Sequence, residues 1–185
     1  MKTDVTKVLV EEHRLILRMI ALLEKNCELL ERRRFADWQF FLYAVDFIRH
    51  YADQFHHAKE EDTLFTALVE NGMPEDNSPV AAMLMEHDQG RAFVRGLEQA
   101  ATKALAGNKG QETAILENAR GYAALLRDHI NKEDNILYPL SERILPEDMR
   151  PGILTAYRRA EGSVPADFVS RYRQMVERYE ERTTG

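Results

Sequence analysis

The chain has 185 residues, of which 44 % are hydrophobic and 30 % charged, so the sequence predicts one globular domain and excludes a disordered chain. The formal net charge is −6 and no lysine- or arginine-rich block stands out, so we expect no nucleic-acid partner. No stretch resembles a signal peptide or a membrane span, and Cys27 is the single cysteine, so we expect no membrane association, no intrachain disulfide and a cytoplasmic location.

Two long helices are predicted in the first part of the chain. Apolar residues recur at helical spacing from about Asp4 to Arg33, which indicates the first helix. The second is expected from about Ala36 to Asn71, because Gly72 and a proline soon after it are typical of a helix end.

Two more long helices are predicted after a polar loop. Ser78 followed by Pro79 is typical of a helix start, and the third helix is expected to end near Ala106. A short connection with two glycines follows, and the fourth helix is expected from about Gln111 to Leu145.

Four long helices with short connections predict an all-α fold, an antiparallel up-down-up-down four-helix bundle. Later prolines and glycines predict two additional short helices, at about residues 151–160 and 165–182. We expect residues 1–145 to form the bundle and residues 146–185 to pack on it as a helical extension of the same domain. No residue of this extension points to chemistry.

An internal repeat points to a functional site. The segment His57-Ala-Lys-Glu-Glu61 can be placed over His129-Ile-Asn-Lys-Glu133, so that the histidine and the glutamate four residues later coincide. Residues four apart share one face of an α-helix. His57 and Glu61 can therefore bind one metal ion together, and so can His129 and Glu133.

The repeat extends to two further histidines. Glu12-His13 falls over Glu86-His87. In an antiparallel hairpin, residues equidistant from the turn lie opposite each other. The midpoints between successive histidines of the set 13, 57, 87 and 129 are positions 35, 72 and 108, which all fall in predicted connections. The four histidines should therefore form one layer.

The helix faces that carry these residues are largely apolar and are expected to face the core, with Tyr43, Leu84 and Ile136 among their members. Burying imidazoles and carboxylates there costs several kcal/mol unless they satisfy one another in a proton-sharing network or bind metal. We favour metal. The predicted metal ligands are His13, His57, Glu61, His87, His129 and Glu133.

Other assignments remain open near these residues. His56 with Glu60 has the same spacing as His57 with Glu61, but the face of this pair also carries Arg49 and Thr63, which indicates exposure to solvent. We therefore prefer the register of His57.

Some neighbouring polar residues have weaker claims. Asp134 could replace Glu133 as a ligand. Glu12 and Glu86 should project about 100° away from the histidines that follow them, and a contact that supports a ligand is the alternative. His50 lies two turns from the predicted layer and should pack or support a ligand rather than bind metal.

Four short segments resemble the hemerythrin-like, or HHE cation-binding, family over about residues 4–145. The segments are EEHR (11–14), HHAKEEDTLF (56–65), MEHD (85–88) and HINKEDNILYPL (129–140). The resemblance implies a four-helix bundle with two iron ions joined by an oxygen or hydroxide bridge. It also implies roles for the six residues: Glu61 and Glu133 bridge both metals, His13 and His57 bind one iron, and His87 and His129 bind the other.

The sequence departs from the oxygen-carrying hemerythrins. Those proteins have a second histidine one turn after the histidine of the third helix, where this chain has Arg91, and their last carboxylate lies where this chain has Asp134. The six-ligand set resembles bacterial hemerythrin-like proteins and iron-centre repair proteins instead. A missing ligand implies an open coordination position and favours redox or small-ligand chemistry.

Three functions are therefore considered. The leading hypothesis is a cytoplasmic di-iron protein that binds or senses a diatomic ligand, oxygen or nitric oxide, or acts in a redox or iron-stress response. The second is an enzyme of iron-centre repair or peroxide consumption, with Tyr122, His50 and Arg91 as residues that tune the site. The third is a metal-free helical scaffold. The ligands also suit manganese or zinc.

Overall fold

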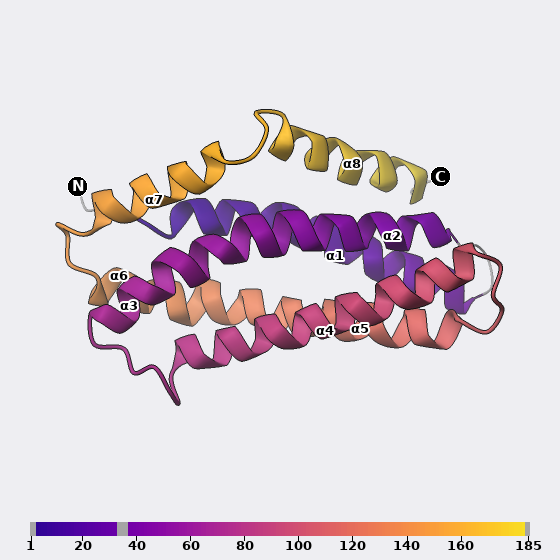
Figure 1. Cartoon of the computed structure of the whole chain (residues 1–185), viewed down its shortest axis with the longest axis horizontal. Helices are drawn as coiled ribbons and strands as arrows, with labels where there is room; N and C mark the ends of the chain where they lie inside the picture. The colour runs from indigo at the N-terminus through magenta and orange to yellow at the C-terminus, as the bar shows by residue number, and fades with distance from the viewer. Residues whose placement is uncertain (1–2, 33–36, 184–185) are drawn as a thin grey trace.

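The computed structural model describes residues 3–32 and 37–183, and this part of the chain is helical without any strand. Long helical rods lie side by side, and two shorter helices run along one side of them (Figure 1). The expected boundaries at Arg33 and Ala36, and the turn near position 35, lie outside the described residues. In the described part, no helix is long and apolar enough to cross a membrane.

The first rod is α1 (Lys7–Glu31). It starts three residues later than predicted, because the Asp4 side chain stands before the helix and accepts hydrogen bonds from the backbone amides of Thr6 and Lys7 at 2.9 and 3.1 Å. This is the role of a capping residue, which satisfies amides that have no partner within the helix.

The second rod changes helical type along its length. It consists of α2 (Trp38–Phe47), η1 (Ile48–His57), η2 (Glu60–Phe65) and α3 (Thr66–Glu70). The η segments are π-helical, so their amides bind the carbonyl five residues back rather than four. Gly72 ends the rod with a φ of 99°, as the sequence predicts.

The other two rods follow the predicted signals. α4 (Pro79–Leu105) starts at Ser78, whose hydroxyl accepts a hydrogen bond from the Ala81 amide at 3.1 Å. The last rod consists of α5 (Glu112–Lys132), the π-helical η3 (Glu133–Leu137) and α6 (Tyr138–Ile144).

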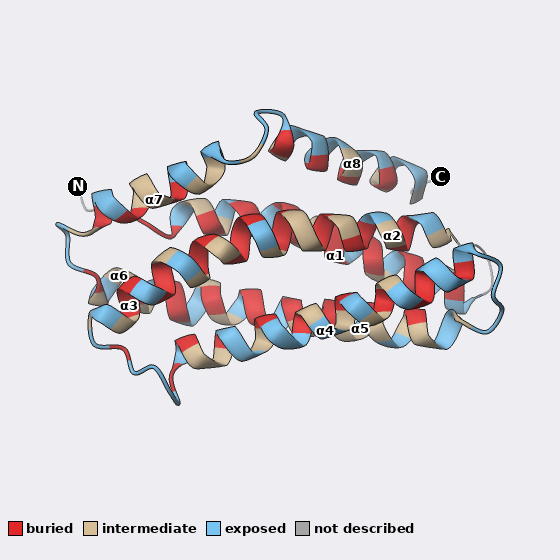
Figure 2. Cartoon of the chain, in the orientation of Figure 1, coloured by how far each residue is buried: buried red, intermediate tan, exposed pale blue. Residues whose placement is uncertain are grey.

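The buried side of the rods (Figure 2) is divided into two apolar clusters. The larger cluster contains residues of α1, α2, η1, α4, α5 and α8. The smaller cluster contains residues from the start of α1 and from α3, η3 and α7. Seven buried residues that belong to neither cluster lie together between them: His13, His56, His57, Glu60, His87, His129 and Glu133. A polar layer therefore crosses the middle of the core.

The C-terminal helices α7 (Arg150–Gly162) and α8 (Phe168–Thr183) pack on the rods, α7 against η2 and α8 against α1. Arg150 is fully buried and donates hydrogen bonds to the backbone carbonyls of Thr3, Glu142 and Leu145. These bonds fix the start of α7 to both ends of residues 3–145.

The prediction that Tyr43, Leu84 and Ile136 face the core was wrong, because they are 43 %, 38 % and 57 % exposed. Ile136 lies in η3, where the α-helical angle used to assign its face does not apply. Tyr43 lies at the edge of α2 with its ring 5.8 Å from that of Tyr179 on α8.

Candidate metal centre

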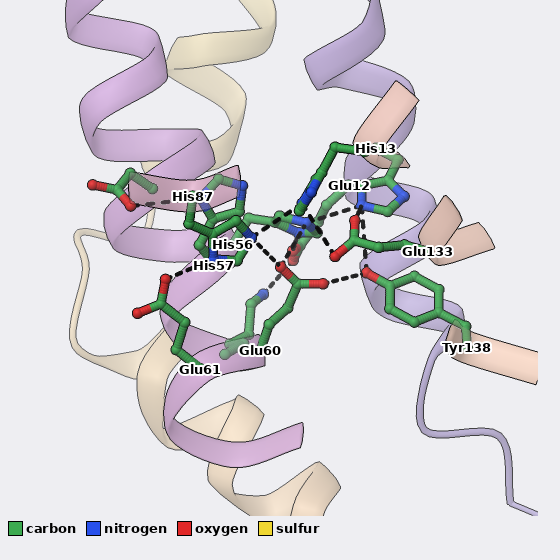
Figure 3. A network of polar contacts seen from close by, with 12 residues as sticks. Glu12, His13, His56, His57, Glu60, Glu61, His87, Glu133 and Tyr138 are labelled. Carbon is green, nitrogen blue, oxygen red and sulfur yellow. Dashed lines mark hydrogen bonds and ion pairs between the residues drawn. The ribbon is translucent and has the colours of Figure 1, made fainter. Parts of the chain in front are cut away.

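Two groups of histidine and glutamate side chains occupy the polar layer. Within each group, one nitrogen or oxygen atom per residue lies within 4.8 Å of the others. Figure 3 shows side chains of both groups pointing toward one another. The two-histidine group is His13, His56, Glu60 and Glu133, and the three-histidine group is His57, His87, His129 and again Glu60.

Two buried carboxylates lie between the groups. Glu133 places one oxygen 3.3 Å from His13 Nε2 and the other 3.2 Å from His129 Nε2. Glu60 Oε2 lies 3.7 Å from His56 Nε2 and 3.6 Å from His87 Nε2. Both side chains are completely buried, and neither oxygen of Glu133 nor Oε2 of Glu60 has a hydrogen-bond partner among the described residues. Such carboxylate oxygens need a cation.

The imidazoles show the same need. His13 Nε2 lies 3.0 Å from His56 Nε2, and His87 Nε2 lies 3.0 Å from His129 Nε2. A neutral imidazole has one proton, and a carboxylate beside Nδ1 draws that proton to Nδ1. Two Nε2 lone pairs then face each other, which is favourable only with a cation between them. The donor set therefore fits a metal ion in each group.

A ring of outer carboxylates holds four histidines in this orientation. The Nδ1 atoms of these histidines donate hydrogen bonds to carboxylates at 2.6–2.9 Å. Such contacts orient metal-binding imidazoles and increase their basicity. The pairs are His13 with Asp134, His56 with Glu12, His87 with Glu61, and His129 with Glu86.

Glu61 belongs to this outer ring and to neither of the two groups, although the sequence predicts that it bridges two metal ions. Its Oε1 accepts from His87 Nδ1 at 2.6 Å and from Arg91 at 2.7 Å. Although burial by itself raises the pKa of Glu61, these two partners lower it below its ordinary value. His57 also lies elsewhere than predicted, because it joins His87 rather than His13.

The prediction that His56 and Glu60 face solvent was wrong as well, because they are 1 % and 0 % exposed. The prediction assumed the α-helical rotation of about 100° per residue. η1 and η2 are π-helical, so successive residues rotate less and the adjacent His56 and His57 both point inward. Five of the predicted ligands thus lie in the two groups, and Glu60 stands where Glu61 was expected.

The electrostatics of the layer favour neutral imidazoles at two positions. Burial holds the pKa of His56 and of His57 well below the ordinary value, so both rings keep lone pairs for a metal ion. Burial also raises the pKa of Glu60, and the nearby Glu133 carboxylate raises it further. Burial by itself raises the pKa of Glu133, but the contacts with His129 and His13 lower it more, so this pKa lies well below its ordinary value.

Comparison with known families identifies the fold to which this layer belongs. The hemerythrin HHE cation-binding domain matches residues 4–141. The chain belongs to the hemerythrin HHE family. A search of curated proteins finds no match to it. The family and the buried groups together indicate that this hemerythrin domain binds metal.

The geometry of the hemerythrin domain also gives the register of its internal repeat. His56 is equivalent to His129, Lys59 to Lys132 and Glu60 to Glu133, each 73 residues apart. Unlike the alignment of His57 with His129, this alignment also matches the lysine that lies between the histidine and the glutamate, and it makes His56 and Glu60 the counterparts of His129 and Glu133. His57 then falls over Ile130, so the extra histidine belongs to one half of the repeat.

One side of the hemerythrin site is covered by residues that sequence reasoning did not connect with it. The Tyr138 hydroxyl donates a hydrogen bond to Glu60 Oε1 at 2.5 Å. The fully buried Lys59 binds the Glu12 carboxylate and lies 3.3 Å from Glu161 of α7. The C-terminal extension therefore contacts Lys59, the partner of the outer-ring residue Glu12, through Glu161.

The three-histidine group adjoins a cavity of about 290 Å³ that is partly open to solvent. Its walls include Gly90, Tyr122 and apolar side chains of α4 and α5. Arg91 and Asp53 also line the cavity and form an ion pair at 2.7 Å. His50 is not part of either group; its Nδ1 donates to the Asp46 carbonyl at 3.0 Å.

Proposed function

We propose that this hemerythrin-family chain is an antiparallel four-helix bundle that binds two iron ions in the cytoplasm and, through them, a small diatomic ligand, oxygen or nitric oxide. Seven residues would hold the ions, which amends the six predicted from the sequence. They are His13 and His56 for one ion, His57, His87 and His129 for the other, and Glu60 and Glu133 shared between the two.

The observation that carries the proposal is the unsatisfied pair of shared carboxylates. Glu60 and Glu133 are completely buried, and three of their four oxygens have no hydrogen-bond partner in the described chain. Each lies between imidazole nitrogens of both groups. Two cations, one on each side, satisfy all of these atoms together.

The unequal donor sets favour ligand binding at one ion. The three-histidine group offers three nitrogens and the two-histidine group offers two, with the same shared carboxylates. When bound, iron supplies reversible redox chemistry and a position for a small ligand. The chain's own contribution is to orient the imidazoles through the outer carboxylates and to exclude bulk water from the layer.

Mixed imidazole and carboxylate donors suit iron, and they also suit manganese or zinc. Elemental analysis of protein purified without added metal is therefore the first test, with two irons per chain expected. His56→Gln should lose iron, whereas His50→Gln, a histidine on the same rod outside both groups, should keep both ions. Equal iron contents in the two variants would contradict the assigned site.

Stopped-flow mixing of the reduced protein with oxygen and with nitric oxide tests the ligand. New absorption bands with either gas are expected. Iron-loaded protein that gives no new bands with either gas contradicts the ligand assignment and leaves the metal assignment standing.

A catalytic role is the second candidate, and the cavity beside the three-histidine group favours it. A space of about 290 Å³ holds roughly ten water-sized groups, far more than a diatomic ligand needs. Peroxide consumption and recovery of a damaged iron–sulfur enzyme are the two reactions to assay with the iron-loaded protein. No turnover in either assay would exclude this candidate.

A further inference from the structure

Among the described residues, Tyr138 is the tyrosine whose hydroxyl contacts the two-histidine group. Its ring is 2 % exposed and lies parallel to the His13 ring, with centroids 5.6 Å apart. Its hydroxyl lies 2.5 Å from Glu60 Oε1 and 3.4 Å from His13 Nε2 (Figure 3). The hydroxyl therefore points at atoms that would bind metal, rather than at a backbone carbonyl.

The distance from the Tyr138 oxygen to His13 Nε2 is similar to the distances between donor atoms within the two-histidine group. Within the two-histidine group, His13 Nε2 lies 3.0 Å from His56 Nε2 and 3.3 Å from Glu133 Oε2. Two ligand atoms at right angles around one ion, each roughly 2.1 Å from it, are separated by roughly 3 Å. The Tyr138 oxygen lies 3.4 Å from His13 Nε2, which is close to the separation of neighbouring ligands, and its 2.5 Å contact with Glu60 Oε1 is a hydrogen bond in the absence of metal.

The donor count points the same way. The three-histidine group has His57 as an additional donor, and the equivalent residue in the other half of the repeat, Ile130, cannot bind metal. Tyr138 supplies an oxygen to the two-histidine group, which otherwise has one donor fewer. With Tyr138 counted, each group offers five protein donors.

We propose that Tyr138 is a protein ligand of the iron held by His13 and His56, with its phenol oxygen bound directly to the ferric ion. This inference rests on the proposed iron site. On binding, the O–H bond breaks, the oxygen keeps the electron pair that it shares with iron, and the proton passes to solvent. An anionic oxygen favours ferric over ferrous iron. Tyr138 would therefore bind the ferric ion in the oxidised protein. Once an external reductant supplies one electron and the phenolate takes up a proton from solvent, its release would leave this position to a small ligand.

The test uses the full chain loaded with ferric iron. A phenolate bound to ferric iron gives a visible charge-transfer band, and resonance Raman excitation in this band shows tyrosine ring vibrations. Tyr138→Phe should lose both signals. Tyr157→Phe is the matched control, because Tyr157 is also buried against the smaller cluster and its hydroxyl has no hydrogen-bond partner in the described chain. It should keep both signals.

Azide is a second probe of the same position. The ferric wild-type protein should give no azide-dependent absorption change, whereas ferric Tyr138→Phe should gain one. A residue that only orients Glu60 through a hydrogen bond produces no tyrosine vibrations at all. Wild-type protein with two bound irons and no such vibrations would overturn the inference and leave the proposed function intact. A chain that binds no iron overturns the proposed function instead, and elemental analysis distinguishes the two outcomes.

Discussion

Replacing Lys59 by methionine should destabilise the metal-free protein by about 3–5 kcal/mol, whereas the same change at Lys132 should cost about 1 kcal/mol. The two lysines are equivalent in the repeat, and each binds a glutamate of the outer ring. Lys59 is completely buried, and without its ammonium group the Glu12 carboxylate, 9 % exposed, loses its cation. Lys132 is 31 % exposed, so solvent can replace much of its contact with Glu86.

Thermal unfolding of both variants after treatment with a chelator measures this difference. For a chain of this size, about 3–5 kcal/mol corresponds to a fall in Tm of roughly 6–20 °C for Lys59→Met. The chelator is essential, because bound metal stabilises the folded state by itself. Equal Tm values for the two variants would refute the reasoning that burial sets the cost.

The pH dependence provides an independent check. Burial raises the pKa of Glu12, and Lys59 opposes this rise. In Lys59→Met the folded-state pKa of Glu12 is therefore higher still, above that of the unfolded chain. The destabilisation is complete above this folded-state pKa and diminishes as the pH falls through it, because the folded protein then takes up a proton. The loss in free energy of unfolding of Lys59→Met, relative to the unchanged protein, should be larger at about pH 8 than at about pH 5.

Further predictions concern Glu60 and Glu61, Cys27, and Arg150. Glu60→Gln should reduce the iron content of purified protein, whereas Glu61→Gln should keep two irons and alter only affinity, as measured by competition with a chelator; the reverse result would restore the sequence-predicted register. Burial raises the pKa of Cys27 to about 11, so its thiol should not react with a disulfide reagent at about pH 8 until the protein is unfolded, and rapid labelling of the folded protein would refute its burial. Arg150→Met should destabilise the protein by about 3 kcal/mol in urea unfolding, since it leaves buried carbonyls without donors, and a loss below about 1 kcal/mol would show that α7 is fixed by other contacts.

The polar layer could be predicted because helix ends and histidines are separate signals in the sequence. Gly72 and Ser78 give the ends of two rods without any reference to the site, and the structure confirms both. Histidines equidistant from the connections then had to lie at similar depth. This argument placed His13, His87 and His129 in the core, where the structure has them.

The inward face of the second rod could not be predicted in the same way. Its assignment depends on the rotation per residue, and sequence periodicity gives no sign that η1 and η2 are π-helical. With α-helical rotation, His56 and His57 cannot both point inward, so one had to be chosen. The match of Lys59 with Lys132 gave the information that settles the choice, since both hold an outer carboxylate.

The contribution of the C-terminal extension was missed for a different reason. Glu161 and Tyr157 have no partner nearby in the sequence, and their spacing resembles that of an ordinary surface helix. Glu161 meets Lys59 across more than a hundred residues, and Tyr157 joins the smaller apolar cluster. Such contacts follow from how α7 folds back onto η2, which local patterns do not contain.

One end of the polar layer adjoins a partly open cavity and the other end is covered by packed side chains. A small molecule and an electron can therefore reach the layer by different routes. The partly open cavity leads to the three-histidine group, while Tyr138 and α7 pack beside the two-histidine group. A molecule that enters by the cavity meets the three-histidine group first, and the buried carboxylates of Glu60 and Glu133 lie between this group and the other. An electron needs no opening and can tunnel through the packed helices. With iron bound as proposed, a reductant too large to enter could therefore reduce it from the outer surface.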